Sequence, residues 1–145
     1  MTGKKPSPPD ETLCLLDESL APSVAEALKL VGYNFTAVSL VFQGRTGVED
    51  PEIIHWLRER DAVWVHADDR ARREHRKLIT AGNVRTLWVY RPRGMMSGAE
   101  QLRILAYALP DLLDRYRQQP KHRHYRVFAH GAAGRTRIRL ERYDI

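Results

Sequence analysis

The sequence lacks the features that define several large classes of protein. Its single cysteine, Cys14, excludes an internal disulfide and lies in an apolar run, where it fits a small buried side chain. No apolar stretch approaches the roughly 20 residues that a membrane-spanning helix requires. The first nine residues carry lysines and prolines but no apolar core of a secretory signal. We therefore expect residues 1–12 to form a disordered leader, and we expect a cytoplasmic protein with no membrane partner.

Motifs for nucleotide cofactors and for zinc are also missing. The chain contains neither Gly-x-Gly-x-x-Gly nor Gly-x-x-x-x-Gly-Lys-Ser/Thr, so no nucleotide cofactor is expected. One cysteine and the lack of a His-x-x-x-His pair disfavour zinc, although the chain has six histidines. No nucleophile elbow is present either. The chemistry that remains is that of carboxylates and basic side chains.

Basic charge is concentrated near the C-terminus. The whole chain holds 24 Lys and Arg against 18 Asp and Glu, which gives a net charge of +6. The first 120 residues are nearly balanced, with 17 basic and 16 acidic side chains, whereas residues 121–145 hold seven basic and two acidic ones. Such a patch favours a phosphate backbone or an acidic partner protein. A surface that only keeps the protein soluble would have the same composition.

Apolar runs alternate with helix-like segments along the chain. We expect strands near 13–16, 35–42, 62–67 and 84–90, and helices near 22–31, 50–60, 70–81 and 97–116. Residues 125–130 and 135–140 flank a glycine-rich turn and predict a β-hairpin. The alternation predicts an α/β fold with a mainly parallel sheet and helices on both faces. We expect one domain over residues 13–120, with residues 121–145 as a basic hairpin extension packed on it.

Three acidic residues occupy equivalent places in this pattern. Asp17 ends the first strand, Asp50 begins the second helix, and Asp68 ends the third strand. In a parallel sheet these positions meet at the edge formed by the carboxyl ends of the strands, which is where open α/β sheets bind ligands. Two carboxylates about 5 Å apart repel by roughly 3 kcal/mol at an effective dielectric of 20, so such a cluster requires protons or a cation. Oxygen ligands favour Mg²⁺ or Mn²⁺ over zinc.

Each of these acids also has a purely structural interpretation. Asp50 is a candidate N-cap, with Pro51 in the first helical turn. Asp68 or Asp69 is a candidate cap for the basic helix that follows. Asp17 has the weakest structural explanation, because a carboxylate next to a buried strand is costly unless something pairs with it.

Three sequence blocks resemble the PIN-like domain family. They are Leu15-Leu16-Asp17-Glu18-Ser19-Leu20, Asp50-Pro51-Glu52-Ile53-Ile54 and Val65-His66-Ala67-Asp68-Asp69-Arg70. They are similar to compact PIN-like proteins grouped with VapC-type toxins, and the similarity spans roughly residues 13–116. The resemblance implies a Mg²⁺- or Mn²⁺-dependent ribonuclease, commonly the toxin of a type II toxin–antitoxin pair. Asp17, Asp50 and Asp68 match the family's catalytic, metal-binding acids.

The sequence departs from the family pattern at two positions. Many relatives have a second aspartate two residues after the position of Asp68, but this chain has Arg70 there. Asp69 is a candidate replacement as a metal ligand. The middle ligand is either Asp50 or Glu52, and the sequence does not decide between them.

Several arginines are candidates for binding the substrate backbone. Arg91 and Arg93 follow the fourth strand, and Arg70 and Arg73 begin the basic helix. In the second arm of the predicted hairpin, Arg135, Arg137 and Arg139 alternate with other residues and share one face of a strand. Solvated loops and helices have the same composition, so each interpretation stays open.

The sequence therefore predicts a metal-dependent endoribonuclease with RNA as its substrate. The resemblance also implies a cognate antitoxin protein as a partner, and a homodimer is a further arrangement that stays open. The alternative is a non-catalytic PIN-like module that has a degenerate acidic pocket and binds nucleic acid or an antitoxin. A phosphate-accepting receiver domain is disfavoured, because it expects a lysine where this chain has Arg91.

Overall fold

The computed structural model describes residues 11–43, 45, 47–68, 70–91, 96–130 and 137–144, and for Ala71 and Arg72 it describes the backbone alone. These residues form a six-stranded sheet with the order β2-β1-β3-β4-β5-β6. The strands are β1 (Cys14–Leu16), β2 (Phe35–Ala37), β3 (Val63–His66), β4 (Arg85–Val89), β5 (His124–His130) and β6 (Arg137–Arg142). The pairs up to β4–β5 are parallel, and β6 is antiparallel to β5. This arrangement confirms the predicted α/β fold and the C-terminal hairpin.

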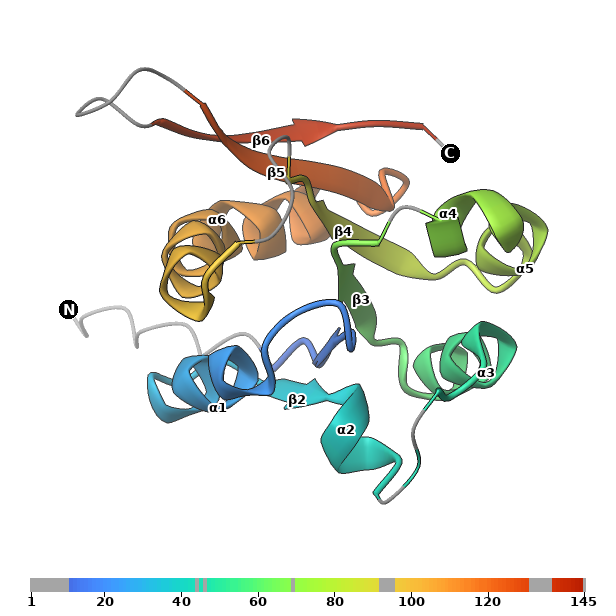
Figure 1. Cartoon of the computed structure of the whole chain (residues 1–145). Helices are drawn as coiled ribbons and strands as arrows, with labels where there is room; N and C mark the ends of the chain where they lie inside the picture. Colours follow the sequence, from blue (N-terminus) through green and yellow to red (C-terminus); the bar gives the residue numbers. More distant parts are fainter. Residues whose placement is uncertain are drawn as a thin grey trace, which may run out of the picture.

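Helices cover both faces of the sheet (Figure 1). On one face, α1 (Pro22–Leu30) and α6 (Gly98–Gln118) pack against each other and against inward-facing strand residues such as Val65, Leu87 and Val127. On the other face, α3 (Asp50–Arg60) and α5 (Arg76–Ala81) bury their apolar residues against Leu15 and Trp64. The central strands are therefore buried on both sides, which explains their uninterrupted apolar runs.

The long helix α6 forms because its apolar residues recur at helical spacing. Ile104, Leu105, Leu109 and Leu112 are all at most 3% exposed. Ser97 caps the helix, since its hydroxyl oxygen accepts a hydrogen bond from the Glu100 amide at 3.2 Å. None of the helices in the described part of the chain combines the length and apolarity needed to cross a membrane.

Three local predictions were wrong in detail. The second strand ends at Ala37, and the apolar residues that follow it form the short helix α2 (Val38–Val41). The N-cap of α3 is Glu49, so Asp50 is already a helical residue and makes no cap. The basic segment forms two helices, α4 (Arg70–Glu74) and α5, because the backbone leaves helical geometry at His75.

The C-terminal residues belong to the same sheet as the rest of the chain. β5 extends the parallel sheet beyond β4, and Ile138 and Leu140 of β6 pack against the core that α6 covers. Residues 1–10 of the predicted leader 1–12, the hairpin turn and Arg135 lie outside the described residues.

Candidate functional site

Asp17 directly follows β1 and is held by the end of β3. Its amide donates a hydrogen bond to the Val65 carbonyl at 2.8 Å. Its carboxylate accepts from the amide and hydroxyl of Ser19 at 3.2 and 2.8 Å, and lies 3.4 Å from the indole nitrogen of Trp64. The Ser19 hydroxyl oxygen in turn accepts from the Ala67 amide at 3.0 Å. This network fixes the Asp17 carboxylate beside the carboxyl end of β3.

Asp68 lies where β3 passes into α4. One carboxylate oxygen accepts a hydrogen bond from the Arg70 amide at 3.0 Å, which is a capping contact for α4. The other oxygen is 3.4 Å from the Arg70 guanidinium, at a partly exposed position. The predicted capping role is therefore present, and the side chain still reaches the surface.

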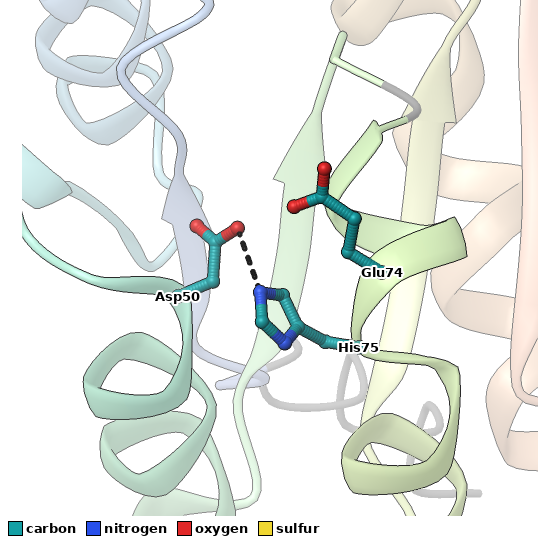
Figure 2. Close-up of side chains that lie close together, drawn as sticks. All are labelled: Asp50, Glu74 and His75. Atoms are coloured by element: carbon teal, nitrogen blue, oxygen red, sulfur yellow. Dashed lines mark ion pairs between the residues drawn. The ribbon is translucent and has the colours of Figure 1, made fainter.

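Asp50 begins α3, and its carboxylate is directed at the α4–α5 junction. Because it makes no cap, it is available for contacts across this edge of the sheet. Its partner across this edge is His75, whose Nε2 lies 3.4 Å from a carboxylate oxygen of Asp50 (Figure 2). The Asp50 side chain is 30% exposed.

The three aspartates line one pocket, although they lie far apart in sequence. The pocket has a volume of about 360 Å³ and is lined by Asp17, Glu18, Ser19, Val48, Asp50, Ile53, Asp68, Arg70 and Glu74. It lies at the carboxyl ends of β1 and β3, beside the start of α3. The predicted convergence of Asp17, Asp50 and Asp68 is thus present in the structure.

The electrostatics of Asp50 reflect this crowding. Burial raises the pKa of the Asp50 carboxyl above its ordinary value, and His75 acts against this effect. The charges of Asp17, Asp68 and Glu74 raise the pKa further. A carboxylate in these surroundings is stabilised by any cation that enters the pocket.

The structure adds two residues that the sequence interpretation missed as site residues. One ligand atom each of Asp50, Glu74 and His75 lie within 4.8 Å of one another. Figure 2 shows the Glu74 carboxylate and the His75 ring on the same side, facing Asp50. The sequence did not single out Glu74 or His75, because a single helix over residues 70–81 gives no reason for the pair to turn inward. The signal available in the sequence was the adjacent pair of possible metal ligands, Glu74 and His75.

Of the two remaining predicted metal ligands, one lies away from the pocket and the other cannot be placed within the described residues. Glu52 is absent from its lining and instead forms a two-bond ion pair with Arg45, at 2.5 and 2.8 Å. This pairing lowers the pKa of the Glu52 carboxyl. Of the two candidates for the middle metal ligand, Asp50 therefore lines the pocket and Glu52 does not. Asp69 lies outside the described residues.

The predicted substrate-binding arginines fall into separate groups. Arg70 lines the acidic pocket, and Arg73 lines a neighbouring groove of about 630 Å³ together with Glu74, His75, Arg76, Lys77 and Leu78. Arg91 is half-buried just after β4. Arg137 and Arg139 line a different groove of about 700 Å³, together with Arg103 and Tyr107 of α6. Arg93 and Arg135 lie outside the described residues.

Comparisons of the chain with protein-family models, with curated proteins and with solved structures find no match. The donor set of the pocket is nevertheless chemically distinctive. It offers carboxylate oxygens from five residues and one imidazole nitrogen beside them. Mg²⁺ prefers oxygen ligands and Mn²⁺ shares that preference, so the residues present fit either ion.

Proposed function

We propose that the chain is a Mg²⁺- or Mn²⁺-dependent endoribonuclease of the PIN-like type, acting in the cytoplasm. The observation that carries this proposal is the convergence of Asp17, Asp50 and Asp68 on one pocket. The order and spacing of these acids are also what the sequence resemblance associates with ribonuclease activity. Glu18 and Glu74 add two further carboxylates to the same pocket.

In this proposal the carboxylates hold one or two divalent ions. A bound ion of this kind lowers the pKa of a water and polarises a phosphoryl oxygen. Asp17 is oriented for the task by Ser19, and Asp50 gains the most from a cation because burial and three other acids raise its pKa. His75 beside Asp50 offers one nitrogen ligand next to the oxygen ligands that both ions prefer.

Basic residues next to the pocket supply contacts for the phosphate backbone. Arg70 lies in the pocket wall, and the groove lined by Arg73, Arg76 and Lys77 adjoins the pocket through Glu74. Contacts of this kind neutralise phosphates and give binding that weakens as salt rises.

The toxin role and its partners are part of the same proposal. A cognate antitoxin would have to block the acidic pocket or cover the basic surface of residues 121–145. That segment holds seven basic and two acidic residues, so an acidic antitoxin segment is the complementary choice. A homodimer is compatible with this arrangement.

The test is cleavage of a fluorescently labelled RNA by the full chain with Mn²⁺, with Mg²⁺ and with EDTA. We expect cleavage with Mn²⁺, and we expect Asp17→Asn and Asp68→Asn to lower its rate by about 100-fold or more, since even indirect support of a metal site is worth 10- to 100-fold. The matched control is Glu52→Gln, which removes an acid outside the pocket and should leave the rate unchanged. Cleavage that persists unchanged in EDTA and in Asp17→Asn would falsify the metal mechanism.

One observation favours the alternative, a non-catalytic module that binds nucleic acid or an antitoxin. Arg70 lines the pocket and pairs with Asp68, so a fixed positive charge already offsets part of the acidic cluster. Under this alternative Arg70→Ala raises Mn²⁺ affinity but produces no cleavage. Under the main proposal the wild-type chain already cleaves RNA.

A further inference from the structure

The sheet carries a row of aromatic rings on the side of β4, β5 and β6 that faces away from α6. We call this the aromatic face and define it by Trp88, Tyr90, Arg126, Phe128 and Tyr143. Strand register explains it, because Trp88 pairs with Arg126, Phe128 pairs with Arg139, and His130 pairs with Arg137. Residues that pair in this way point to the same side of a sheet.

Each ring contacts the next one in a row that crosses the three strands. Trp88 lies 5.2 Å from Tyr90 and 5.9 Å from Tyr143 between ring centroids, and Tyr90 lies 6.1 Å from Phe128. The Arg126 guanidinium lies 5.8, 5.6 and 5.3 Å from the centroids of Trp88, Tyr90 and Phe128. It is fixed by an ion pair with Glu141. The aromatic face is therefore a continuous surface with a guanidinium group at its centre.

The aromatic face is partly accessible to solvent, whereas the opposite side of the same three strands is covered by a helix. Val127, Ile138 and Leu140 point to the other side, where α6 packs on β5 and β6. The rings of the aromatic face are only half-buried. In Figure 1 the hairpin forms the top of the molecule, with α6 beneath it and no labelled helix above.

The charges around the aromatic face are mostly positive. Arg139 is 63% exposed and Arg137 is exposed. Both lie on the edge strand β6, in register with the rings, and both also line the groove that β6 forms with α6. Within the described residues no acidic partner contacts Arg137, whereas Arg139 shares Glu141 with Arg126. An apolar partner would have to desolvate these guanidinium groups without compensation, so the composition favours a polyanion that also offers flat apolar surfaces.

We propose that the aromatic face binds single-stranded RNA, with bases stacked on Tyr90 and Phe128 and phosphates bound by Arg137 and Arg139. Exposed aromatic rings on a sheet stack on unpaired bases, and neighbouring arginines bind the backbone. Stacking tolerates any base and also any single-stranded DNA. The choice of RNA therefore rests on the proposed function, whereas the binding itself does not require the acidic pocket.

The aromatic face also lies close to the acidic pocket in the sheet. Trp88 pairs with His66 of β3, and the His66 ring lies 3.1 Å from the carbonyl oxygen of Asp68. The carboxyl end of β4 is therefore one strand away from the pocket. An RNA chain that lies across the rings and continues toward β3 would reach the aspartates of the acidic pocket.

The test measures binding of a labelled, unstructured RNA of about 12 nucleotides by fluorescence anisotropy, a length within the usual range for one stacking surface. The full chain is used in EDTA, so that cleavage does not contribute. We expect Phe128→Leu and Tyr90→Leu to weaken binding by about tenfold each, because leucine keeps the apolar volume and loses the ring face. The control is Tyr33→Leu, which changes an aromatic residue that is half-buried after α1 and lies outside both the aromatic face and the groove lined by Arg137 and Arg139. It should leave the affinity unchanged, and a duplex of the same sequence should bind more weakly.

A second pair of variants tests the contacts with the RNA phosphates and leaves the hydrophobic core of the protein unchanged. Arg139→Gln should weaken binding and reduce the slope of log affinity against log salt by about one, as expected for one lost phosphate contact. Lys29→Gln removes the same charge from α1 and should change neither quantity. Both side chains are exposed, so both variants should fold.

Several results would overturn the proposal. Loss of affinity in Tyr107→Leu with unchanged affinity in Phe128→Leu would move the bases to the groove that Arg137 and Arg139 form with α6. Unchanged affinity in Phe128→Leu and Arg139→Gln would exclude the aromatic face. No RNA binding, together with a dimer in light scattering that Phe128→Leu dissociates, would assign the face to a second copy of the chain. Failure of RNA cleavage with binding intact would contradict the proposed function alone.

Discussion

At the residue scale, Asp50 combines partial burial with three acidic neighbours. Both effects raise its pKa, so the folded state favours the protonated form more than the unfolded state does. Stability from this group is therefore fully present below the ordinary carboxyl pKa of 3.8 and is lost as the pH rises through the raised value. At pH 7 the charged side chain destabilises the fold when no cation is bound.

Replacing Asp50 by a neutral residue should consequently stabilise the metal-free protein at pH 7. We expect Asp50→Asn to raise Tm by about 1–2 °C, a small effect because solvent still reaches the side chain. The gain over the wild type should disappear below pH 3.8, where both side chains are neutral. Differential scanning calorimetry in EDTA across this pH range measures both quantities.

The control variant changes Glu52, a carboxyl whose pKa is shifted in the opposite direction. Arg45 lowers the pKa of Glu52, so this group contributes stability above the ordinary value of 4.5 that is lost as the pH falls through the lowered value. Glu52→Gln should therefore lower Tm slightly at pH 7 or leave it unchanged. A fall of Tm in Asp50→Asn at pH 7 would show that the ion pair with His75 outweighs burial and acidic crowding.

Glu74 and His75 are the residue-scale additions to the predicted site. Since one ligand atom of each lies within 4.8 Å of an Asp50 oxygen, both should contribute to holding a cation. We expect Glu74→Gln to weaken Mn²⁺ binding by about tenfold in isothermal titration calorimetry. Glu26→Gln, a change on an exposed part of α1, is the control. Equal affinities for the wild type and Glu74→Gln would remove Glu74 from the site.

At the scale of the elements, sequence periodicity correctly predicted the helix whose apolar residues face the core. It failed at the element boundaries that contacts with the core do not determine. The apolar spacing of α6 locates it to within about two residues, because its inner face is fully buried. The run from Phe35 to Phe42 is apolar except for Thr36 and Ser39, so its composition does not show that the strand ends at Ala37. The break at His75 contains neither glycine nor proline, and the sequence therefore gives no local signal for it.

The dependence of the fold on α6 can be measured directly. Leu112 is fully buried between α6 and the sheet, so Leu112→Ala should lower the free energy of unfolding by about 2–5 kcal/mol. Leu30→Ala removes the same atoms at a position that is 87% exposed, and it should cost far less. Urea denaturation followed by circular dichroism measures both changes. Similar losses in the two variants would contradict the described packing.

At the scale of the whole molecule, topology explains why part of the site was predictable. Asp17 and Asp68 end neighbouring parallel strands, and parallel strands present their carboxyl ends at one edge. Their meeting therefore follows from the alternation of strands and helices. The approach of Glu74 and His75 depends on how α4 and α5 pack against α3, which no local pattern specifies. The aromatic face likewise depends on the register of β4, β5 and β6.

The central claim is that the carboxylates gathered at this edge bind a divalent cation. The most direct measurement is an anomalous difference map from crystals of the full chain soaked in Mn²⁺. We predict a peak within coordination distance of carboxylate oxygens from Asp17, Asp50 and Asp68. An empty pocket at saturating Mn²⁺, or peaks confined to other acids such as Glu52, would contradict the account.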